Sequence, residues 1–274
     1  MDVAVGIVAQ RDNERAQALA ATLIDSLENA TVVVDESTGA AIDEDGVPVA
    51  SMASRELVVS IGGDGTLLFV AREVGRTPIL GINLGEVGFL NAVDPGDAVP
   101  VVADVVDSVR ADGAVDGRRL DRLRAEGEGW ALEPALNEVV VHGPRRGHGG
   151  GATIEIRVDG ERYAEGHADG VLVATPTGST AYNLGEGGPL VRPGADALIV
   201  NQMAATEAMP PLVVDRDAEI ELSVADAETA YAISDGRNRR ELEPPATVDV
   251  SVADEPVTLA GPRANFFEAL EKLE

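Results

Sequence analysis

Three glycines surround a single carboxylate in the first third of the chain, in the segment Gly62-Gly63-Asp64-Gly65-Thr66. The segment follows the apolar run 57–61 and precedes apolar residues at helical spacing, which predicts a strand, a turn and a helix in that order. Glycines let a backbone approach a bulky anion closely, and the first N–H groups of a helix attract phosphate. Asp64 would repel a phosphate, but its carboxylate could bind a metal ion or accept the proton of a hydroxyl group. The pattern indicates phosphoryl transfer, and the alternative is a tight turn in which Asp64 only caps the helix.

Two further groups of polar residues lie later in the chain. The pair Asn137-Glu138 precedes an apolar run, and its side chains could hydrogen-bond a ribose or an adenine edge, or simply begin a strand. Asp169 precedes a second apolar run, which is followed by four hydroxyl-bearing residues, Thr175, Thr177, Ser179 and Thr180. The proline and glycine between them predict a rigid polar loop rather than regular structure. So many hydroxyls could face a polyhydroxylated ligand, although Ser and Thr also cap helices.

The elements that must position these residues fall into two groups. Strands and helices alternate over roughly the first hundred residues, which predicts a parallel, doubly wound sheet. Ligands of such sheets bind outside the carboxyl ends of the strands, where the turn with Asp64 would lie. The Gly-, Asp- and Ala-rich stretch 36–54 predicts a loop, and 95–111 predicts one more helix. We therefore expect an α/β domain over residues 1–112.

Short strands dominate beyond this point, among them those expected at 119–123, 138–142, 170–174 and 230–234. They predict a second, mostly β domain over residues 113–255. Apolar residues on one helical face at 264–273 predict that the C-terminal segment 256–274 packs back on the first domain. The fold class is therefore α/β plus all-β.

The composition restricts the partners of the chain. Its 48 acidic and 21 basic residues give a formal net charge of -27, which disfavours binding along a nucleic-acid backbone. Carboxylates are spread over the expected helices and strands, as on proteins of extreme halophiles, so we expect molar salt to be needed for full stability. Cysteine is absent, which excludes disulfides, thiolate metal sites and cysteine nucleophiles. No apolar run approaches the ~20 residues of a membrane span, so we expect a cytoplasmic protein without a membrane partner.

Two common nucleotide-binding patterns do not occur in this sequence. There is no G-x-x-x-x-G-K-[ST], and no G-x-G-x-x-G follows the first expected strand. P-loop enzymes and ordinary dehydrogenases are therefore disfavoured.

Taken in chain order, the motifs resemble those of NAD kinases, and they comprise 62–66, 81–90, Asn137-Glu138, Asp169-Gly170, 175–183 and 187–189. The resemblance covers most of the chain. The GGDG turn alone also occurs in diacylglycerol-type lipid kinases and in sugar kinases of the phosphofructokinase type. The segment TPTGSTAYN together with the Asn-Glu pair is far more specific to NAD kinases.

The resemblance implies a reaction and a fold. A phosphoryl group would pass from ATP or polyphosphate to the 2′-hydroxyl on the adenosine side of NAD, with Mg²⁺ or another divalent cation. The N-terminal domain would be of the α/β type shared with phosphofructokinases and diacylglycerol kinases, and the C-terminal domain would be β-sandwich-like. Homodimers or homotetramers whose NAD site borrows residues across an interface are also implied.

The resemblance also implies roles for individual residues. Asp64 matches the catalytic aspartate of the family. The positions that receive the donor phosphates are Gly62, Gly63, Gly65 and Thr66. The positions that line the NAD site are Asp64, Gly65, Asn137, Glu138, Asp169, Thr177, Thr180, Ala181 and Tyr182.

One stretch departs from the family, and two other functions compete. Residues 201–211, NQMAATEAMPP, lack the proline-, histidine- and arginine-bearing pattern expected after the preceding strand, whereas Gly236 matches a late family turn. The competing functions are a lipid or small-molecule kinase with the same GGDG turn, and a non-catalytic module that senses NAD or another nucleotide.

Overall fold

The computed structural model describes residues 2–85, 88–145, 147 and 150–271. The chain forms two compact units, one from Met1–Leu120 with Glu255–Glu274 and the other from Asp121–Asp254, each around its own buried apolar core. Some positions in our sequence predictions lie outside the described residues: Glu86 and Val87 of the segment 81–90, and Leu273 of the C-terminal helix.

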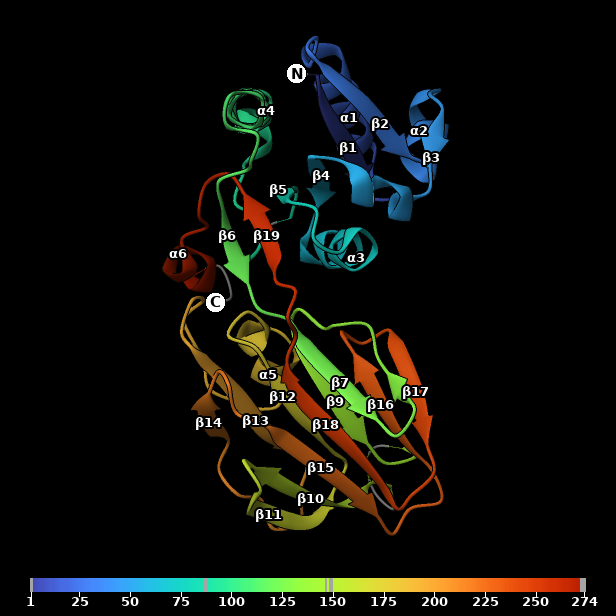
Figure 1. Cartoon of the computed structure of the whole chain (residues 1–274), viewed down its shortest axis with the longest axis vertical. Coiled ribbons are helices and arrows are strands. Elements are labelled where there is room, and N and C mark those ends of the chain that lie inside the picture. The colour runs from blue at the N-terminus through green and yellow to red at the C-terminus, as the bar shows by residue number, and fades with distance from the viewer. Residues whose placement is uncertain (1, 86–87, 146, 148–149, 272–274) are drawn as a thin grey trace. The chain divides into compact units, whose positions relative to one another are not determined.

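The first unit contains one seven-stranded sheet in the order β3-β2-β1-β4-β5-β19-β6 (Figure 1). The strands are β1 (Val3–Ala9), β2 (Ala30–Asp35), β3 (Gly46–Val47), β4 (Leu57–Gly62), β5 (Ile79–Asn83), β6 (Gly117–Leu120) and β19 (Val257–Ala260). Neighbouring strands are parallel from β3 through β19, and β6 is antiparallel to β19. The predicted α/β class is confirmed, although two strands from later in the chain complete the sheet.

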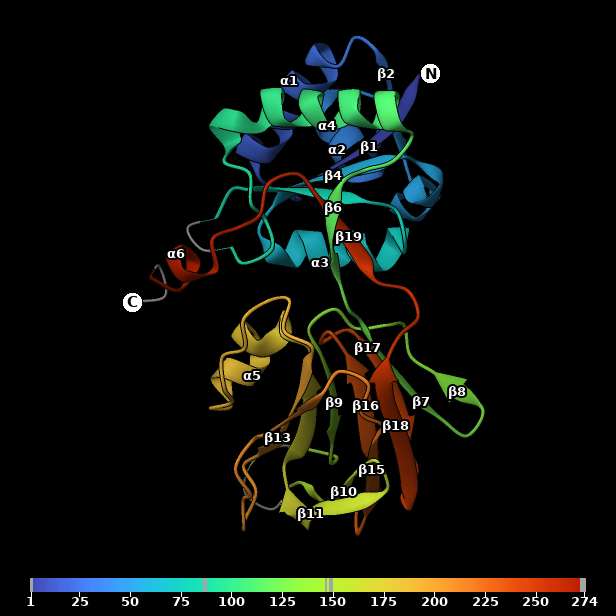
Figure 2. The ribbon, with the colours of Figure 1, turned by 60° about the vertical axis from the view of Figure 1, so that its left-hand side comes forward.

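Helices cover both faces of this sheet (Figure 2). They are α1 (Glu14–Ser26), α2 (Glu36–Ile42), α3 (Asp64–Val74), α4 (Ala98–Asp112), α6 (Phe266–Glu271), and the 3-10 turns η1 (Val49–Ser54) and η2 (Pro95–Asp97). α1 and α4 share one apolar cluster with Leu80 and Ile82 of β5. Gly81 points to the opposite face, where it approaches Leu67 of α3. None of the helices within the described residues has both the length and the apolar character needed to cross a membrane.

The stretch 36–54, expected to be a loop, contains α2 and η1, so that prediction was wrong. Asp35 caps α2, because its carboxylate accepts hydrogen bonds from the N–H groups of Ser37 and Thr38 at 3.0 and 3.4 Å. Position 39 of α2 requires glycine, because a Cβ there would lie only 2.9 Å from the Gly46 nitrogen. Capping and close packing of the backbone outweigh the weak helix propensity of this stretch.

The second unit consists of two six-stranded sheets, in the orders β11-β10-β15-β18-β7-β8 and β14-β13-β12-β9-β16-β17. Their strands are β7 (Leu123–Gly127), β8 (Trp130–Ala131), β9 (Glu138–His142), β10 (Ala152–Val158), β11 (Glu161–Ala168), β12 (Gly170–Ala174), β13 (Ala197–Met203), β14 (Leu212–Asp215), β15 (Ile220–Ala225), β16 (Ala230–Ser234), β17 (Asn238–Leu242) and β18 (Ala246–Val252). Alternate residues of both sheets form one shared core, as in a β-sandwich. The predicted all-β class of this part is confirmed.

The strand expected at 119–123 is two strands, so that prediction was wrong. Gly117–Leu120 is β6 and pairs with β19 in the first unit, and a new strand, β7, begins at Leu123 in the second unit. The chain crosses between the units at Leu120, within the range 113–255 expected for the second domain. The sequence RLDRL at 119–123 contains no local signal that its two leucines belong to strands of different sheets.

Candidate active site

The turn between β4 and α3 has the geometry of an anion-binding site. Gly63 is the N-cap of α3 in an extended conformation, and the helix begins at Asp64. A Cβ at Gly62 would lie 2.5 Å from the Thr66 hydroxyl oxygen, whereas the positions of a Cβ at Gly63 and Gly65 are open. The first helical hydrogen bond runs from the Thr66 N–H to the Gly63 carbonyl at 3.0 Å, so the N–H groups before it lie at the free helix end. The turn can therefore approach a phosphate closely.

Asp64 is held by three hydrogen-bond donors from one segment. Its Oδ2 accepts from the Phe89 N–H at 2.9 Å, and its Oδ1 accepts from the Leu90 N–H at 3.3 Å and from the Asn91 amide at 3.1 Å. Because Gly63 occupies the cap position and the Asp64 carboxylate bonds to another segment, the alternative that Asp64 only caps the helix is wrong. The carboxylate has one orientation and keeps lone pairs for a ligand.

The segment that supplies these donors follows β5 and is fixed at both ends. The Leu84 N–H donates to the Gly62 carbonyl at 3.2 Å, and the Asn83 N–H donates to the Val93 carbonyl at 2.8 Å. The Phe89 ring packs against Phe266 of α6, with ring centroids 6.0 Å apart. The segment that positions Asp64 is thus itself supported by the C-terminal helix.

The second unit has its own cluster of polar residues around Asn137 and Glu138. Asp235, in the turn after β16, accepts hydrogen bonds from the N–H groups of Leu136, Asn137 and Glu138 at 2.7, 2.8 and 3.2 Å. Asp235 has a left-handed backbone, with φ at 46°, and Gly236 follows with φ at 68°. This geometry turns the carboxylate toward the start of β9. Asp235 is not among the site residues predicted from the sequence, although its neighbour Gly236 matches a late turn of the family.

Glu138 is a buried carboxylate with one oxygen that lacks a partner. The residue is 7% exposed, and its Oε2 has no hydrogen-bond partner among the described residues. Burial raises the pKa of Glu138 to about 7, the charge of Asp235 acts in the same direction, and a hydrogen bond from the Tyr182 backbone opposes both. Glu138 therefore exchanges its proton near neutral pH, and it lies beside the hydroxyl-rich segment.

The hydroxyl-rich segment packs directly on Asn137. The Thr175 N–H donates to the Asn137 carbonyl at 2.9 Å, and the Thr175 hydroxyl donates to the Leu136 carbonyl at 2.7 Å. A Cβ at Gly178 would lie 2.1 Å from the Asn137 carbonyl oxygen, so only glycine fits there. Thr177 is 8% exposed, and Thr180, Ala181 and Tyr182 are half-buried. Asn137, Glu138 and residues 177–182 therefore form one cluster.

Three of the four hydroxyls in this segment, those of Thr175, Ser179 and Thr180, donate hydrogen bonds to backbone carbonyls of the chain. The Ser179 hydroxyl donates to the Pro176 carbonyl at 2.7 Å, and the Thr180 hydroxyl donates to the Thr177 carbonyl at 3.3 Å. The predicted absence of regular structure was wrong, because two short helical turns, η3 (Gly178–Thr180) and α5 (Tyr182–Gly185), lie within this segment.

Two buried asparagines complete the support of this segment. Asn183 is fully buried and donates to the carbonyls of Ser179 and Pro189 at 3.3 and 3.0 Å. Asn201 donates to Asn183 Oδ1 at 3.4 Å and to the Glu186 carbonyl at 3.3 Å. Asn201 is the first residue of the stretch that departs from the family pattern. Asn201 therefore supports the polar segment, a role that the neighbouring residues in the sequence do not indicate.

Asp169 lies away from this cluster. It precedes β12, whereas the hydroxyl-rich segment follows β12, so the strand rise separates Asp169 from Thr175 by roughly 20 Å. The Asp169 carboxylate accepts a hydrogen bond from the Gly147 N–H at 2.8 Å. The structure therefore does not bring Asp169 together with Asn137, Glu138 and residues 177–182 of the same unit.

The described side chains do not assemble a protein metal cage. Within 2–85, 88–145, 147 and 150–271, no group of three or more His, Asp or Glu residues could hold a metal ion. Asp64 offers a single carboxylate in the turn between β4 and α3, whose geometry suits an anion. This arrangement fits Mg²⁺, which proteins often bind through one or two carboxylates together with substrate phosphates.

Comparison with known proteins identifies the family. The model of the ATP-NAD kinase N-terminal domain matches residues 5–109, and that of the C-terminal domain matches residues 136–261. The NAD kinase of Haloarcula marismortui is 55% identical, and that of Halobacterium salinarum is 52% identical, each over 98% of this chain and 99% of the relative. Both relatives come from halophilic archaea.

Among solved structures, the yeast NADH kinase complexed with NADH has the same fold. Its TM-score is 0.86 at 22% sequence identity, over 99% of this chain and 87% of that one. The two domain matches and the two full-length relatives decide the assignment. The chain therefore belongs to the ATP-NAD kinase family, as an enzyme that phosphorylates NAD to NADP.

Proposed function

We propose that Asp64 is the general base when this enzyme transfers a phosphoryl group to the 2′-hydroxyl of the adenosine ribose of NAD. The observation that carries the proposal is the fixed orientation of its carboxylate, which three donors hold at the start of α3. Phosphoryl transfer has a loose transition state that needs alignment and charge neutralisation more than full deprotonation. A carboxylate in a fixed orientation can then accept the hydroxyl proton as the new P–O bond forms.

The turn around Asp64 would hold the phosphate groups of the donor. Gly62, Gly63, Gly65 and Thr66 surround the free N-terminal end of α3, where backbone N–H groups and the helix dipole favour phosphate. The open space at Gly63 and Gly65 supports close approach of a polyphosphate chain. ATP is the donor that the family description names, and polyphosphate is the second donor to test.

A divalent cation such as Mg²⁺ would accompany the donor phosphates, with Asp64 as the protein carboxylate nearest to them. When bound, it would neutralise charge on the transferred group. The chain itself would orient the phosphates through the turn and hold the proton acceptor through Asp64.

The polar cluster of the second unit would bind NAD. The unpartnered Oε2 of buried Glu138 needs a hydrogen-bond partner, which a ribose hydroxyl or an adenine amine can supply. Asn137, Thr177, Thr180, Ala181 and Tyr182 surround the same region of the unit. Asp64 and Gly65, which the resemblance also assigns to NAD, would contact the ribose that receives the phosphate.

Asp169 would serve a different subunit. It lies too far along β12 to share one ribose with Thr177, so we propose that it contributes to the NAD site of a neighbouring copy in a homodimer or homotetramer. Light scattering coupled to size exclusion, in molar salt, tests this directly. A monomer at assay concentration contradicts it.

The experiment for the main proposal is an NADP-formation assay. Purified protein in molar KCl receives NAD, Mg²⁺ and either ATP or polyphosphate, and the NADP formed is coupled to an NADP-specific dehydrogenase. We expect NADP from wild type, much less from Asp64→Asn, and none after the divalent cation is chelated. Equal rates from both proteins contradict the role of Asp64. Both matching family models are ATP-NAD kinase domains, which favours NAD as the acceptor over the lipid-kinase and nucleotide-sensing alternatives. The same assay with lipid acceptors checks the first of these alternatives.

A further inference from the structure

Asn91 supplies the one side-chain donor among the three groups that hold Asp64. Its Nδ2 lies 3.1 Å from Asp64 Oδ1, and the residue is 3% exposed. The other two donors are backbone N–H groups, which a substitution leaves in place. We infer that Asn91 is a positioning residue for the proposed base, acting through this single hydrogen bond. This inference rests on the proposed function of Asp64.

The orientation of the Asn91 amide supports this assignment. Its Oδ1 is buried and has no hydrogen-bond partner among the described residues. Turning the amide over would place that oxygen against Asp64 Oδ1, so that two acceptors would face each other. The unsatisfied, buried Oδ1 of Asn91 is energetically unfavourable. The amide keeps this orientation because its Nδ2 then donates a hydrogen bond to the Asp64 carboxylate.

Gly81 provides the space in which the amide lies. A Cβ at Gly81 would lie 2.1 Å from Asn91 Oδ1 and 2.9 Å from Leu67 Cδ1. The Leu67 methyl group is the end of a flexible side chain and can move, but the amide is confined by its bond to Asp64. A side chain at Gly81 would therefore displace Asn91 from the carboxylate. β5 carries Gly81 in register with Ser60 of β4, the strand that leads to the catalytic turn.

The decisive experiment compares four substitutions by steady-state kinetics and thermal unfolding. We expect Asn91→Ala to lower kcat about tenfold or more, the effect of losing a hydrogen bond to a charged group, with KM for NAD within about twofold of wild type. Asn91→Asp keeps the shape but replaces the donor with a second negative charge, so its kcat should fall further. Gly81→Ala should lower kcat as Asn91→Ala does. The control, Asn13→Ala, removes the cap of α1 and should lower the melting temperature without changing kcat.

Double substitutions separate positioning from a general structural effect. Gly81→Ala with Asn91→Ala should lose no more activity than either alone, because both remove the same bond. When Asp64 is already replaced by Asn, adding Asn91→Ala should cause no further loss of kcat. A kcat for Asn91→Ala within about twofold of wild type overturns the inference, as does an undiminished loss in the Asp64→Asn background. Wild-type turnover in Asp64→Asn itself would instead overturn the proposed function.

Discussion

Asp235 and Asn137 are 98 positions apart in the sequence, and a 2.8 Å hydrogen bond from the Asn137 N–H to the Asp235 carboxylate joins them. The same carboxylate accepts from the N–H groups on either side of Asn137. The turn after β16 thereby fixes the backbone that presents the proposed nucleotide-binding pair.

Asp235→Ala should weaken NAD binding. Three N–H groups lose their acceptor, so we expect KM for NAD to rise about tenfold and stability to fall by about 1–3 kcal/mol. Asp226→Ala is the matched control, because Asp226 also has a left-handed backbone, with φ at 54°, in a turn of the same unit. Steady-state kinetics and denaturant unfolding measure both effects. An unchanged KM in Asp235→Ala would show that the turn does not organise the NAD site.

Glu138 should make stability depend on pH between about 4.5 and 7. The unfolded chain ionises Glu138 above its ordinary pKa of 4.5, whereas the folded protein retains the proton until about 7. The stability from this group is therefore complete below about pH 4.5 and is lost as the pH rises through about 7. Glu138→Gln cannot ionise and should not lose this stability. The free energy of unfolding of the variant minus that of wild type should therefore increase by about 2 kcal/mol between about pH 5 and about pH 8.

Denaturant unfolding at several pH values tests this, with Glu133→Gln as a control at an exposed position nearby. A constant difference between Glu138→Gln and wild type across this range would show that Glu138 is ionised in the folded protein.

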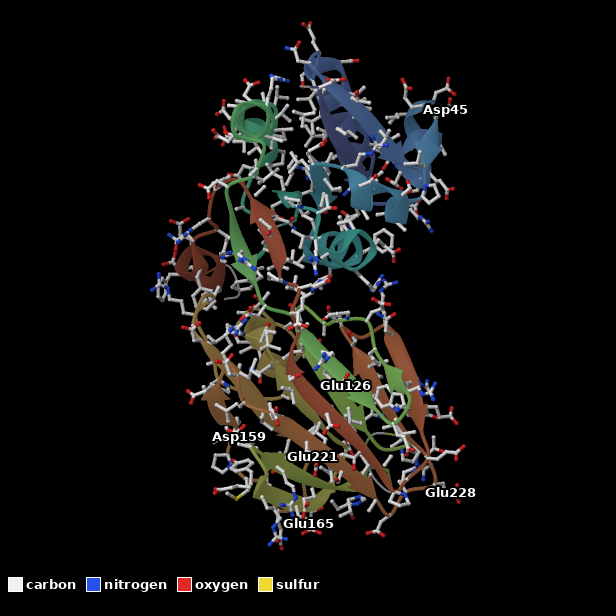
Figure 3. The ribbon with its side chains drawn as sticks, viewed as in Figure 1. Asp45, Glu126, Asp159, Glu165, Glu221 and Glu228 are labelled. Carbon is white, nitrogen blue, oxygen red and sulfur yellow. The ribbon has the colours of Figure 1, made fainter. Side chains whose placement is uncertain are left out.

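A line of three carboxylates crosses the outer face of one sheet of the sandwich. Asp249 of β18 is directly opposite Glu221 of β15 on one side and Glu126 of β7 on the other. Figure 3 labels both glutamates on their strands. Burial raises the pKa of Asp249, and the charges of Glu221, Glu126 and Glu219 add to the effect. Like charges directly opposite on neighbouring strands are destabilising.

Asp249→Asn should therefore stabilise the protein in dilute buffer, by about 0.5 kcal/mol because the group is exposed and partly screened. The gain should disappear in molar KCl, where the screening length falls to about 3 Å. Asp45→Asn is the control, because it removes the same charge from a position outside this line (Figure 3). A gain of equal size at both salt concentrations would contradict an electrostatic origin.

Phe266 should affect turnover through Phe89. The two rings are 6.0 Å apart, and the Phe89 N–H is the nearest donor to Asp64. Phe266→Ala should loosen this segment and lower kcat several-fold, whereas Phe267→Ala removes a neighbouring ring that is 64% exposed and should leave kcat near wild type. Equal effects of the two substitutions on kcat would contradict a specific support of Phe89.

The sequence predicts the fold wherever a local pattern determines the element. Glu138–His142, Gly170–Ala174 and Ala230–Ser234 are strands at the positions expected, because apolar runs bounded by polar or turn residues define them. The pairing of β6 with β19 was not predictable, since it joins segments far apart in sequence and depends on tertiary packing alone. Helix α2 was missed because its stability comes from a cap and close backbone contacts.

In the candidate site, too, only the residues that belong to a local sequence pattern could be predicted. The glycines around Asp64 and its place after a strand were sufficient to select it as a candidate, whereas Asn137 and Glu138 were selected through the resemblance to NAD kinases. Asn91 and Asp235 were not selected, because they act only through contacts with residues that are distant in the chain. The Asp-Gly pair at 235–236, which favours a left-handed turn, is a local signal that could have indicated Asp235.

Asp64 is proposed to accept the proton of the 2′-hydroxyl and to contribute little to NAD affinity. Two measurements on wild type and Asp64→Asn in molar KCl with Mg²⁺ separate these roles: kcat by NADP formation with ATP, and the NAD dissociation constant by calorimetry without ATP, so that no turnover occurs. We predict that kcat falls at least about 100-fold while the dissociation constant changes less than about threefold. A kcat near that of wild type would contradict the account.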